Sequence, residues 1–155
     1  MMKLISSISI LLFSIAVLPM AKAGERRSAL DLDLDALRWE NRVLVLFSPT
    51  EFDPSFQMQK QDLTSGAEGV LGRDLMILEI LEKGNSQAGN MLLSEKAVED
   101  IRMRLGARSG AFEVLLIGKD GMVKLRSAEP VPVKDLFGRI DSMPMRRQEM
   151  DNKKK

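Results

Sequence analysis

The chain of 155 residues carries 23 basic and 22 acidic residues, a formal net charge of +1, and it contains no cysteine, histidine or tyrosine. Without cysteine it can neither form a disulfide nor perform thiol chemistry, and without histidine it lacks the commonest general base and metal ligand. These absences exclude Ser-His and Cys-His triads, His-containing zinc sites and thiolate cofactor sites. Any catalysis would depend on Asp, Glu, Lys, Arg, Ser or Thr side chains.

Residues 1–23 have the features of a cleaved signal peptide. Lys3 supplies a positive charge, residues 4–18 are apolar apart from serines, and residues 21–23 form an A-x-A cleavage site. The apolar segment of about 15 residues is shorter than the roughly 20 that span a bilayer. We therefore expect cleavage, export to the periplasm or the medium, and no membrane span after cleavage.

Removal of residues 1–23 takes away two lysines and no acid, so the formal net charge changes from +1 to −1. A near-neutral chain argues against nucleic acid as the main partner, because phosphate binding needs a concentrated basic surface. The remaining length suits one domain that buries a core without disulfides. We expect a flexible lead-in over residues 24–33, a domain over 34–145, and a basic polar tail over 146–155 that frays.

The first half of the domain predicts two buried strands separated by a helix. Leucine and aspartate alternate over residues 30–35, but this D-x-D-x-D run departs from a calcium loop at its sixth and twelfth positions, so a packed segment is favoured. The apolar runs 42–47 and 75–81 predict strands buried on both faces, and Trp39 before them is expected to cover the core. Asp53 and Pro54 predict a helix start, and the helix should end near Gly66.

The second half predicts two helices on either side of a β-hairpin. Residues 82–90 are expected to form a loop, after which a helix runs from its cap at Ser94 to Gly106. The hairpin covers residues 112–129, with a GKDG turn at 118–121. Period-two alternation in its return strand places Met122, Lys124 and Arg126 on one face and Val123 and Leu125 on the other. A last amphipathic helix should begin at Val133 and stop at Pro144.

The resulting order, β-α-β-α-β-β-α, predicts an α/β fold of three layers with a mixed central sheet. The segments RWENRVLVLFSP, GRDLMILEIL, FEVLLIGKDGMVKLRS and MPMRRQEM together resemble the DUDES-type domain family, domain of unknown function 4174, over residues 34–150. The resemblance implies a thioredoxin-like fold related in shape to peroxiredoxins. It also implies secreted or envelope proteins and kinship with modules of vertebrate secreted and matrix-associated proteins, but no established activity.

The chain departs from thioredoxins where their reactive cysteine pair lies, between the first core strand and the first helix. Residues 48–54 read SPTEFDP there, and hydroxyl groups cannot cycle between thiol and disulfide. The proline that usually precedes the hairpin strand is also absent, since residues 109–111 are Ser-Gly-Ala. Thiol–disulfide exchange and peroxidase activity are therefore excluded.

Basic residues of the hairpin and of the chain end form the candidate binding site: Lys119, Lys124, Arg126, Arg146 and Arg147. A patch of these cations would suit an acidic glycan or a carboxylate-bearing envelope or extracellular protein. Two alternatives stay open. The charges could keep an edge strand from aggregating, or Arg126 or Arg146 could be buried against an acid such as Asp74 or Glu79.

The sequence thus favours a non-catalytic, exported interaction module of thioredoxin-like fold. The alternative is a hydrolase or lyase built on carboxylates, with Arg126 or Arg146 holding an anion. No cofactor or metal is expected: methionines near the end of the chain could bind Cu(I), but no histidine or cysteine supports them.

Overall fold

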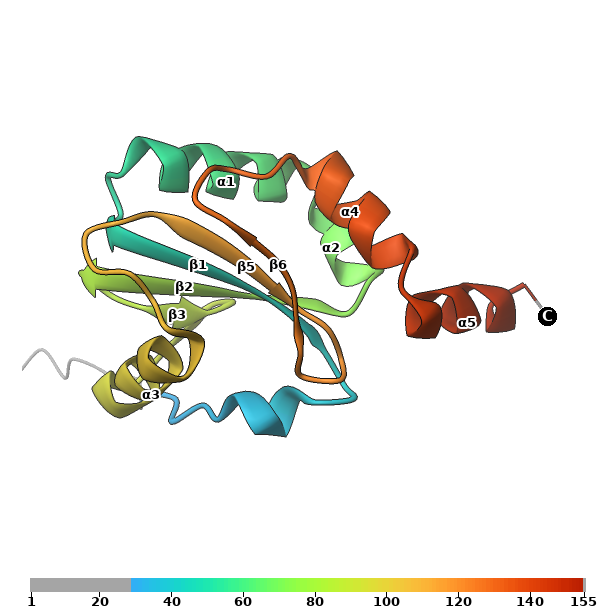
Figure 1. Ribbon diagram of the computed structural model, residues 1–155, viewed down its shortest axis with the longest axis horizontal. Helices are drawn as coiled ribbons and strands as arrows, with labels where there is room; N and C mark the ends of the chain where they lie inside the picture. Colours follow the sequence, from blue (N-terminus) through green and yellow to red (C-terminus); the bar gives the residue numbers. More distant parts are fainter. Residues whose placement is uncertain (1–28, 155) are drawn as a thin grey trace, which may run out of the picture.

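The computed structural model describes residues 29–154, in which a six-stranded mixed sheet lies between two layers of helices (Figure 1). The predicted signal peptide and most of the predicted lead-in lie outside the described residues. In chain order the elements are the 3-10 helix η1 (Leu34–Leu37), β1 (Arg42–Thr50), α1 (Pro54–Ser65), α2 (Ala67–Leu71), β2 (Leu75–Lys83), β3 (Gln87–Ala88), β4 (Met91–Leu92), α3 (Glu95–Leu105), β5 (Glu113–Ile117), β6 (Val123–Ser127), α4 (Val133–Asp141) and α5 (Pro144–Asn152). None of the helices within residues 29–154 is long and apolar enough to cross a membrane.

The strand order is β4-β3-β2-β1-β5-β6. β1 and β2 pair in parallel, and each of the other neighbouring pairs is antiparallel. The two parallel strands are joined through α1 and α2, as a parallel connection requires a crossover. The sequence predicted an α/β fold of three layers with a mixed central sheet, and the structure confirms it.

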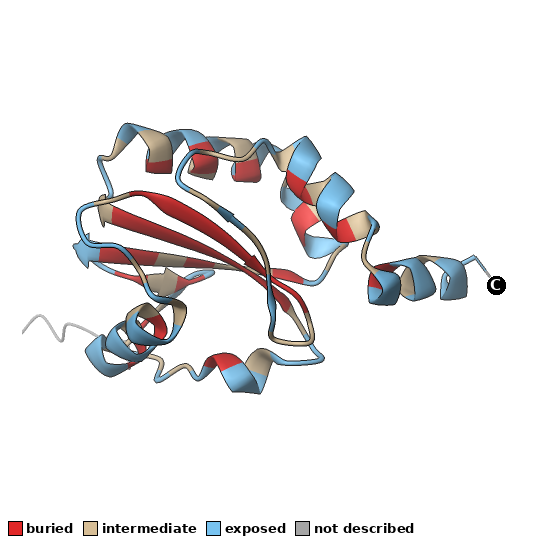
Figure 2. Ribbon diagram, in the orientation of Figure 1, coloured by how far each residue is buried: buried red, intermediate tan, exposed pale blue. Residues whose placement is uncertain are grey.

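Side chains of the central strands alternate between two cores, one on each face of the sheet. Figure 2 shows the central strands as mostly buried. Leu44 and Leu46 of β1 pack on the face covered by α1, α2 and α4. Val43, Val45 and Phe47 pack on the face covered by η1 and α3. A strand with a core on each side must be apolar at every position, which explains the uninterrupted hydrophobic run in β1.

The predicted boundaries of α1 and α3 are confirmed at the positions where the sequence contains a capping residue. The carboxylate of Asp53 accepts hydrogen bonds from the backbone N–H groups of Ser55 and Phe56 at the start of α1. The hydroxyl of Ser94 accepts one from the N–H of Ala97 at the start of α3. Gly106 ends α3 with a φ of 61°, a left-handed conformation that glycine adopts at little cost.

Three local expectations are wrong. The loop expected after β2 contains the short β3–β4 hairpin, which extends the sheet by two strands. The chain after Pro144 does not fray but forms α5, in which Pro144 is the first helical residue and Arg146 is buried. Trp39 does not cover the core, since 62% of it is exposed. Its backbone is left-handed, with a φ of +70°.

A β-bulge in the hairpin changes which side chains share a face. Leu125 lies opposite Leu116, but the next pairing along β6 is Val123 with Ile117, so Lys124 is the extra residue of the bulge. Arg126 reaches toward the C-terminal end of α3, whereas Lys124 lines a pocket beside α4. The predicted strict alternation, with Lys124 and Arg126 on one face, is therefore wrong.

Candidate functional site

A pocket of about 300 Å³ lies where β1 begins, between the β5–β6 turn and the junction of α4 with α5. We call it the basic pocket. Its walls contain four cationic side chains and one acid, together with apolar side chains from the α4–α5 junction. The lining residues are Arg42, Gly118, Lys119, Asp120, Lys124, Arg139, Ser142, Met143, Pro144 and Met145.

Arg42, the first residue of β1, is the most deeply buried of these cations. Only 1% of the residue is exposed. One Nη atom donates to the backbone oxygen of Arg73 at 3.0 Å, and the two Nη atoms reach the carboxylate oxygens of Glu149 at 3.3 and 3.1 Å. Its Nε is buried and donates to no acceptor within the part of the chain that the structure describes. Burying a charged guanidinium with one N–H group that has no acceptor costs folding free energy, so we expect this arginine to have a role beyond packing.

Glu149 of α5 forms ion pairs with three cations. Besides Arg42 it pairs with Lys119, at 2.9 Å, and with Arg146, at 3.2 Å. Burial raises the pKa of Glu149, but hydrogen bonds from these three side chains outweigh it and lower the pKa from 4.5 to about 2. The carboxylate is therefore ionised at any pH near neutrality.

Lys119 and Lys124, both predicted as binding residues, lie in the basic pocket. Lys119 is only 10% exposed and pairs with Asp74 at 3.0 Å as well as with Glu149. Burial lowers the pKa of Lys119, but the hydrogen bonds to its two acids prevail and the pKa is raised. Lys124 pairs with Asp120 at 2.6 Å. Burial raises the pKa of Asp120, but the hydrogen bonds from Lys124 and from the N–H of Met122, together with the charge of Lys124, outweigh it and the pKa is lowered.

Arg146 and Arg147, the other predicted residues at the chain end, differ in their surroundings. Arg146 is buried, with 8% of it exposed, and it pairs with Asp141 at 3.2 Å and with Glu149. It thus braces the fold, although against other acids than Asp74 or Glu79. Arg147 is exposed and has no acid within 4.0 Å among residues 29–154.

Arg126 lies apart from the basic pocket, near the end of α3. It pairs with Glu113 at 3.2 Å, and the side chain of Glu113, of which 1% is exposed, also pairs with Arg108 at 3.0 Å. Burial raises the pKa of Glu113, but the N–H of Arg108 and the two arginine charges lower it below its ordinary value. Of the five cations predicted as one patch, only Lys119 and Lys124 line the basic pocket.

Sequence reasoning missed Arg42, Arg139 and Glu149, which complete the site. Arg42 stands at the start of an apolar run, where only the fold shows that a charge is buried. Arg139 lies on α4 and donates to the backbone oxygen of Lys124 at 3.0 Å. Glu149 lies 107 residues from Arg42, so no local pattern could have linked the two.

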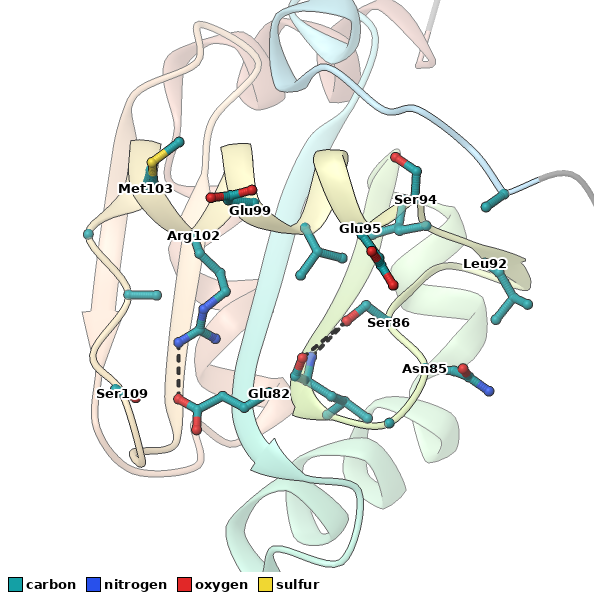
Figure 3. A pocket seen from close by; sticks show the side chains of 17 residues that line it. Glu82, Asn85, Ser86, Leu92, Ser94, Glu95, Glu99, Arg102, Met103 and Ser109 are labelled. Atoms are coloured by element: carbon teal, nitrogen blue, oxygen red, sulfur yellow. Dashed lines mark hydrogen bonds and ion pairs between the residues drawn. The ribbon is translucent and has the colours of Figure 1, made fainter.

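A larger groove of about 980 Å³ runs between α3 and the segment that follows β2 (Figure 3). Its charged side chains are Glu82, Glu95, Glu99 and Arg102, so its lining is acidic overall. Glu82 accepts hydrogen bonds from Arg102 at 3.0 Å and from the N–H of Gly110 at 2.7 Å. The groove is more spacious than the basic pocket. Arg102 pairs with Glu82, but its Nη1 atom is buried and has no acceptor among residues 29–154.

Neither place has the composition of a metal site. Within residues 29–154 no three acidic side chains converge in a way that could hold a metal ion. In the D-x-D-x-D segment, Asp33 caps η1 through the N–H of Asp35, and Asp35 pairs with Arg104 at 2.6 Å.

The comparison with known families matches Domain of unknown function (DUF4174) to residues 33–149. The chain belongs to the DUF4174 family. The match runs from η1 into α5, so it includes Arg42 of the basic pocket and its ion-pair partner Glu149.

Curated relatives of this DUF4174 domain are longer proteins. The chain is 29% identical to Coiled-coil domain-containing protein 80 of Danio rerio in an alignment of 145 residues that covers 83% of this chain and 17% of that protein. It is 29% identical to Sushi repeat-containing protein SRPX2 of Xenopus laevis over 112 residues, which are 70% of this chain and 24% of that protein. The chain thus spans about a quarter or less of these relatives.

The solved structure of reduced 2-Cys peroxiredoxin from Plasmodium vivax is similar with a TM-score of 0.56 and 15% identity, covering 76% of this chain and 85% of that one. This similarity shows the fold alone: the DUF4174 domain is a thioredoxin-like domain. It has no cysteine, so the redox chemistry associated with that fold has no reacting group here.

Proposed function

We propose that this DUF4174 domain is an exported, non-redox binding module that takes up a carboxylate group of its partner in the basic pocket. The proposal is carried by Arg42, a cation 1% exposed that forms part of the pocket wall and has an Nε without an acceptor. Three further cations line the wall: Lys119 and Lys124 are paired with acids, whereas Arg139 donates to a backbone oxygen.

A carboxylate fits the donors better than other anions of the same charge. The guanidinium of Arg42 is planar and already holds both oxygens of Glu149 through its two Nη atoms. Planar, two-pronged contact is how arginine recognises carboxylates. The pocket volume of about 300 Å³ is at the lower end of ligand sites, which suits one acidic side chain or one uronate ring.

The charge state of the site supports binding over catalysis. Burial raises the pKa values of Asp120, Asp141 and Glu149, but hydrogen bonds from paired cations outweigh it, so all three lie below their ordinary values. A carboxyl group that acts as general acid needs a raised pKa instead. These lowered pKa values provide no general acid for a hydrolase or lyase built on carboxylates, which favours the binding module.

Two observations outside the pocket support the module and its export. The curated relatives carry the matching segment as 17% to 24% of their length, the arrangement expected of one module in a longer chain. Residues 1–23 combine a lysine, an apolar segment and an A-x-A site, as signal peptides do.

The test is calorimetric titration of the mature chain, residues 24–155, with an octaglutamate peptide and with an oligogalacturonate. A peptide in which glutamine replaces every glutamate is the uncharged probe. We expect binding of at least one acidic probe and none of the uncharged peptide. Both acidic probes failing to bind at low salt would contradict the proposal.

Matched variants locate the site. Lys124→Gln and Arg139→Gln should each weaken binding by about tenfold, the cost of one charge-assisted contact. Lys96→Gln is the control, because Lys96 also pairs with an aspartate four residues away, at 2.8 Å, but lies on α3. Arg126→Gln should likewise leave the affinity within about twofold, whereas a loss equal to that of Lys124→Gln would favour a patch that includes both faces.

A further inference from the structure

Charge, rather than an apolar face, holds α5 on the domain. Arg146 is its one buried residue within the described chain, and Figure 1 shows the helix projecting from the body of the fold. Figure 2 shows most of its surface exposed. Its ion pairs run from Glu149 to Arg42 and Lys119, and from Arg146 to Asp141. A helix attached in this way can leave the domain without exposing an apolar core.

Glu149 uses the same cations that line the basic pocket. Its oxygens lie 3.1 and 3.3 Å from the Nη atoms of Arg42 and 2.9 Å from Nζ of Lys119. Pro144 and Met145 at the start of α5 also form part of the pocket wall. A ligand carboxylate that used Arg42 fully would therefore compete with Glu149 for donors and with α5 for space.

Because Arg42 needs a negative partner, the competition takes the form of an exchange of one carboxylate for another. Its backbone is fixed by the pairing of β1 with β2, and its guanidinium donates to the backbone oxygen of Arg73 at 3.0 Å, so α5 is not the only element that holds the side chain. Departure of Glu149 alone would leave a buried positive charge without a counter-ion, which is strongly unfavourable. The departure becomes favourable only when another carboxylate arrives.

We infer that α5 is a tethered competitor for two cations of the basic pocket, and that an acidic helical segment of a partner polypeptide replaces Glu149 on Arg42 and Lys119. The inference rests on the proposed function and adds the class of partner and the exchange. A polypeptide is favoured over a glycan because the occupant that the structure shows is a glutamate on a helix. The link of Ser142 and Met143 to α4 keeps the displaced helix on the chain.

The first test compares Glu149→Gln with Asp151→Asn, an exposed acid on the same helix. Calorimetry with the octaglutamate peptide should show Glu149→Gln binding about tenfold more tightly than the native chain, because the competitor is removed. Asp151→Asn should stay within about twofold of the native affinity. Equal or weaker binding by Glu149→Gln would overturn the inference.

The outcomes separate the two proposals. Native binding without tighter binding by Glu149→Gln overturns the exchange and leaves the proposed function standing. Loss of binding in both the native chain and the variant overturns both. Preference for the oligogalacturonate over octaglutamate by the native chain overturns the assignment of a polypeptide partner.

Hydrogen exchange on the native chain keeps the inference testable if Glu149→Gln does not fold. Saturating octaglutamate should speed amide exchange in α5, over residues 147–152, while exchange in α4 stays as it was. Unchanged or slower exchange in α5 would overturn the inference, because the helix would then remain in place when the probe binds.

Discussion

Replacing Glu149 by glutamine should lower the free energy of unfolding by about 2–3 kcal/mol near neutral pH. The drop in the pKa of Glu149 from 4.5 to about 2 corresponds to about 3 kcal/mol of preferential stabilisation of its ionised form. The lower end of the range allows for solvent screening, since 24% of the side chain is exposed. Glutamine keeps the shape of the side chain but leaves Arg42 without its negative partner.

The pH dependence of this difference is the sharper test. The folded pKa is lower than the unfolded one, so the stabilisation by Glu149 is present above about pH 4.5 and is lost as the pH falls toward 2. Urea denaturation followed by far-ultraviolet circular dichroism should show the native chain and Glu149→Gln converging between pH 5 and pH 2. A gap below about 1 kcal/mol at pH 7, or one that does not change with pH, would refute the reasoning. Asp151→Asn is the control.

Other predictions concern the stability of the fold. Gly121→Ala should cost about 1–2 kcal/mol because its φ is +79°, whereas Gly138→Ala, with open space around it inside α4, should stabilise by about 0.5–1 kcal/mol. Glu113→Gln should cost about 2–3 kcal/mol, since the buried carboxylate balances two arginines; a loss below about 1 kcal/mol in urea denaturation would contradict this. Ser94→Ala should cost about 1 kcal/mol through loss of the α3 cap, and an unchanged melting temperature would argue against it.

Local patterns in the sequence were sufficient for the central architecture. The apolar runs of β1 and β2 predicted burial on two faces, and Asp53, Ser94 and Gly106 marked helix ends through short-range capping. These features depend on neighbours within a few residues, so periodicity and cap chemistry indicate them directly.

What the sequence did not indicate depends on distant partners. α5 has little apolar character, and the pairs that hold it join residues far apart in the chain. The bulge at Lys124 shifts a single pairing and turns neighbouring cations to opposite faces, which strict alternation cannot anticipate. The basic pocket contains Lys119 and Lys124, two of the five cations that the sequence suggested for a binding patch, but its buried cation, Arg42, emerges only from the fold.

The most direct test of the account is the side-chain Nε–H resonance of Arg42 in a nitrogen-15 spectrum, assigned by its loss in Arg42→Lys. If a carboxylate of the peptide binds Arg42, this resonance should shift during titration with the octaglutamate peptide, and the shift should saturate at the affinity measured by calorimetry. No shift is expected with the glutamine-substituted peptide. Binding of octaglutamate that leaves the Arg42 resonance in place, while other arginine resonances move, would contradict the claim that the basic pocket is the binding site.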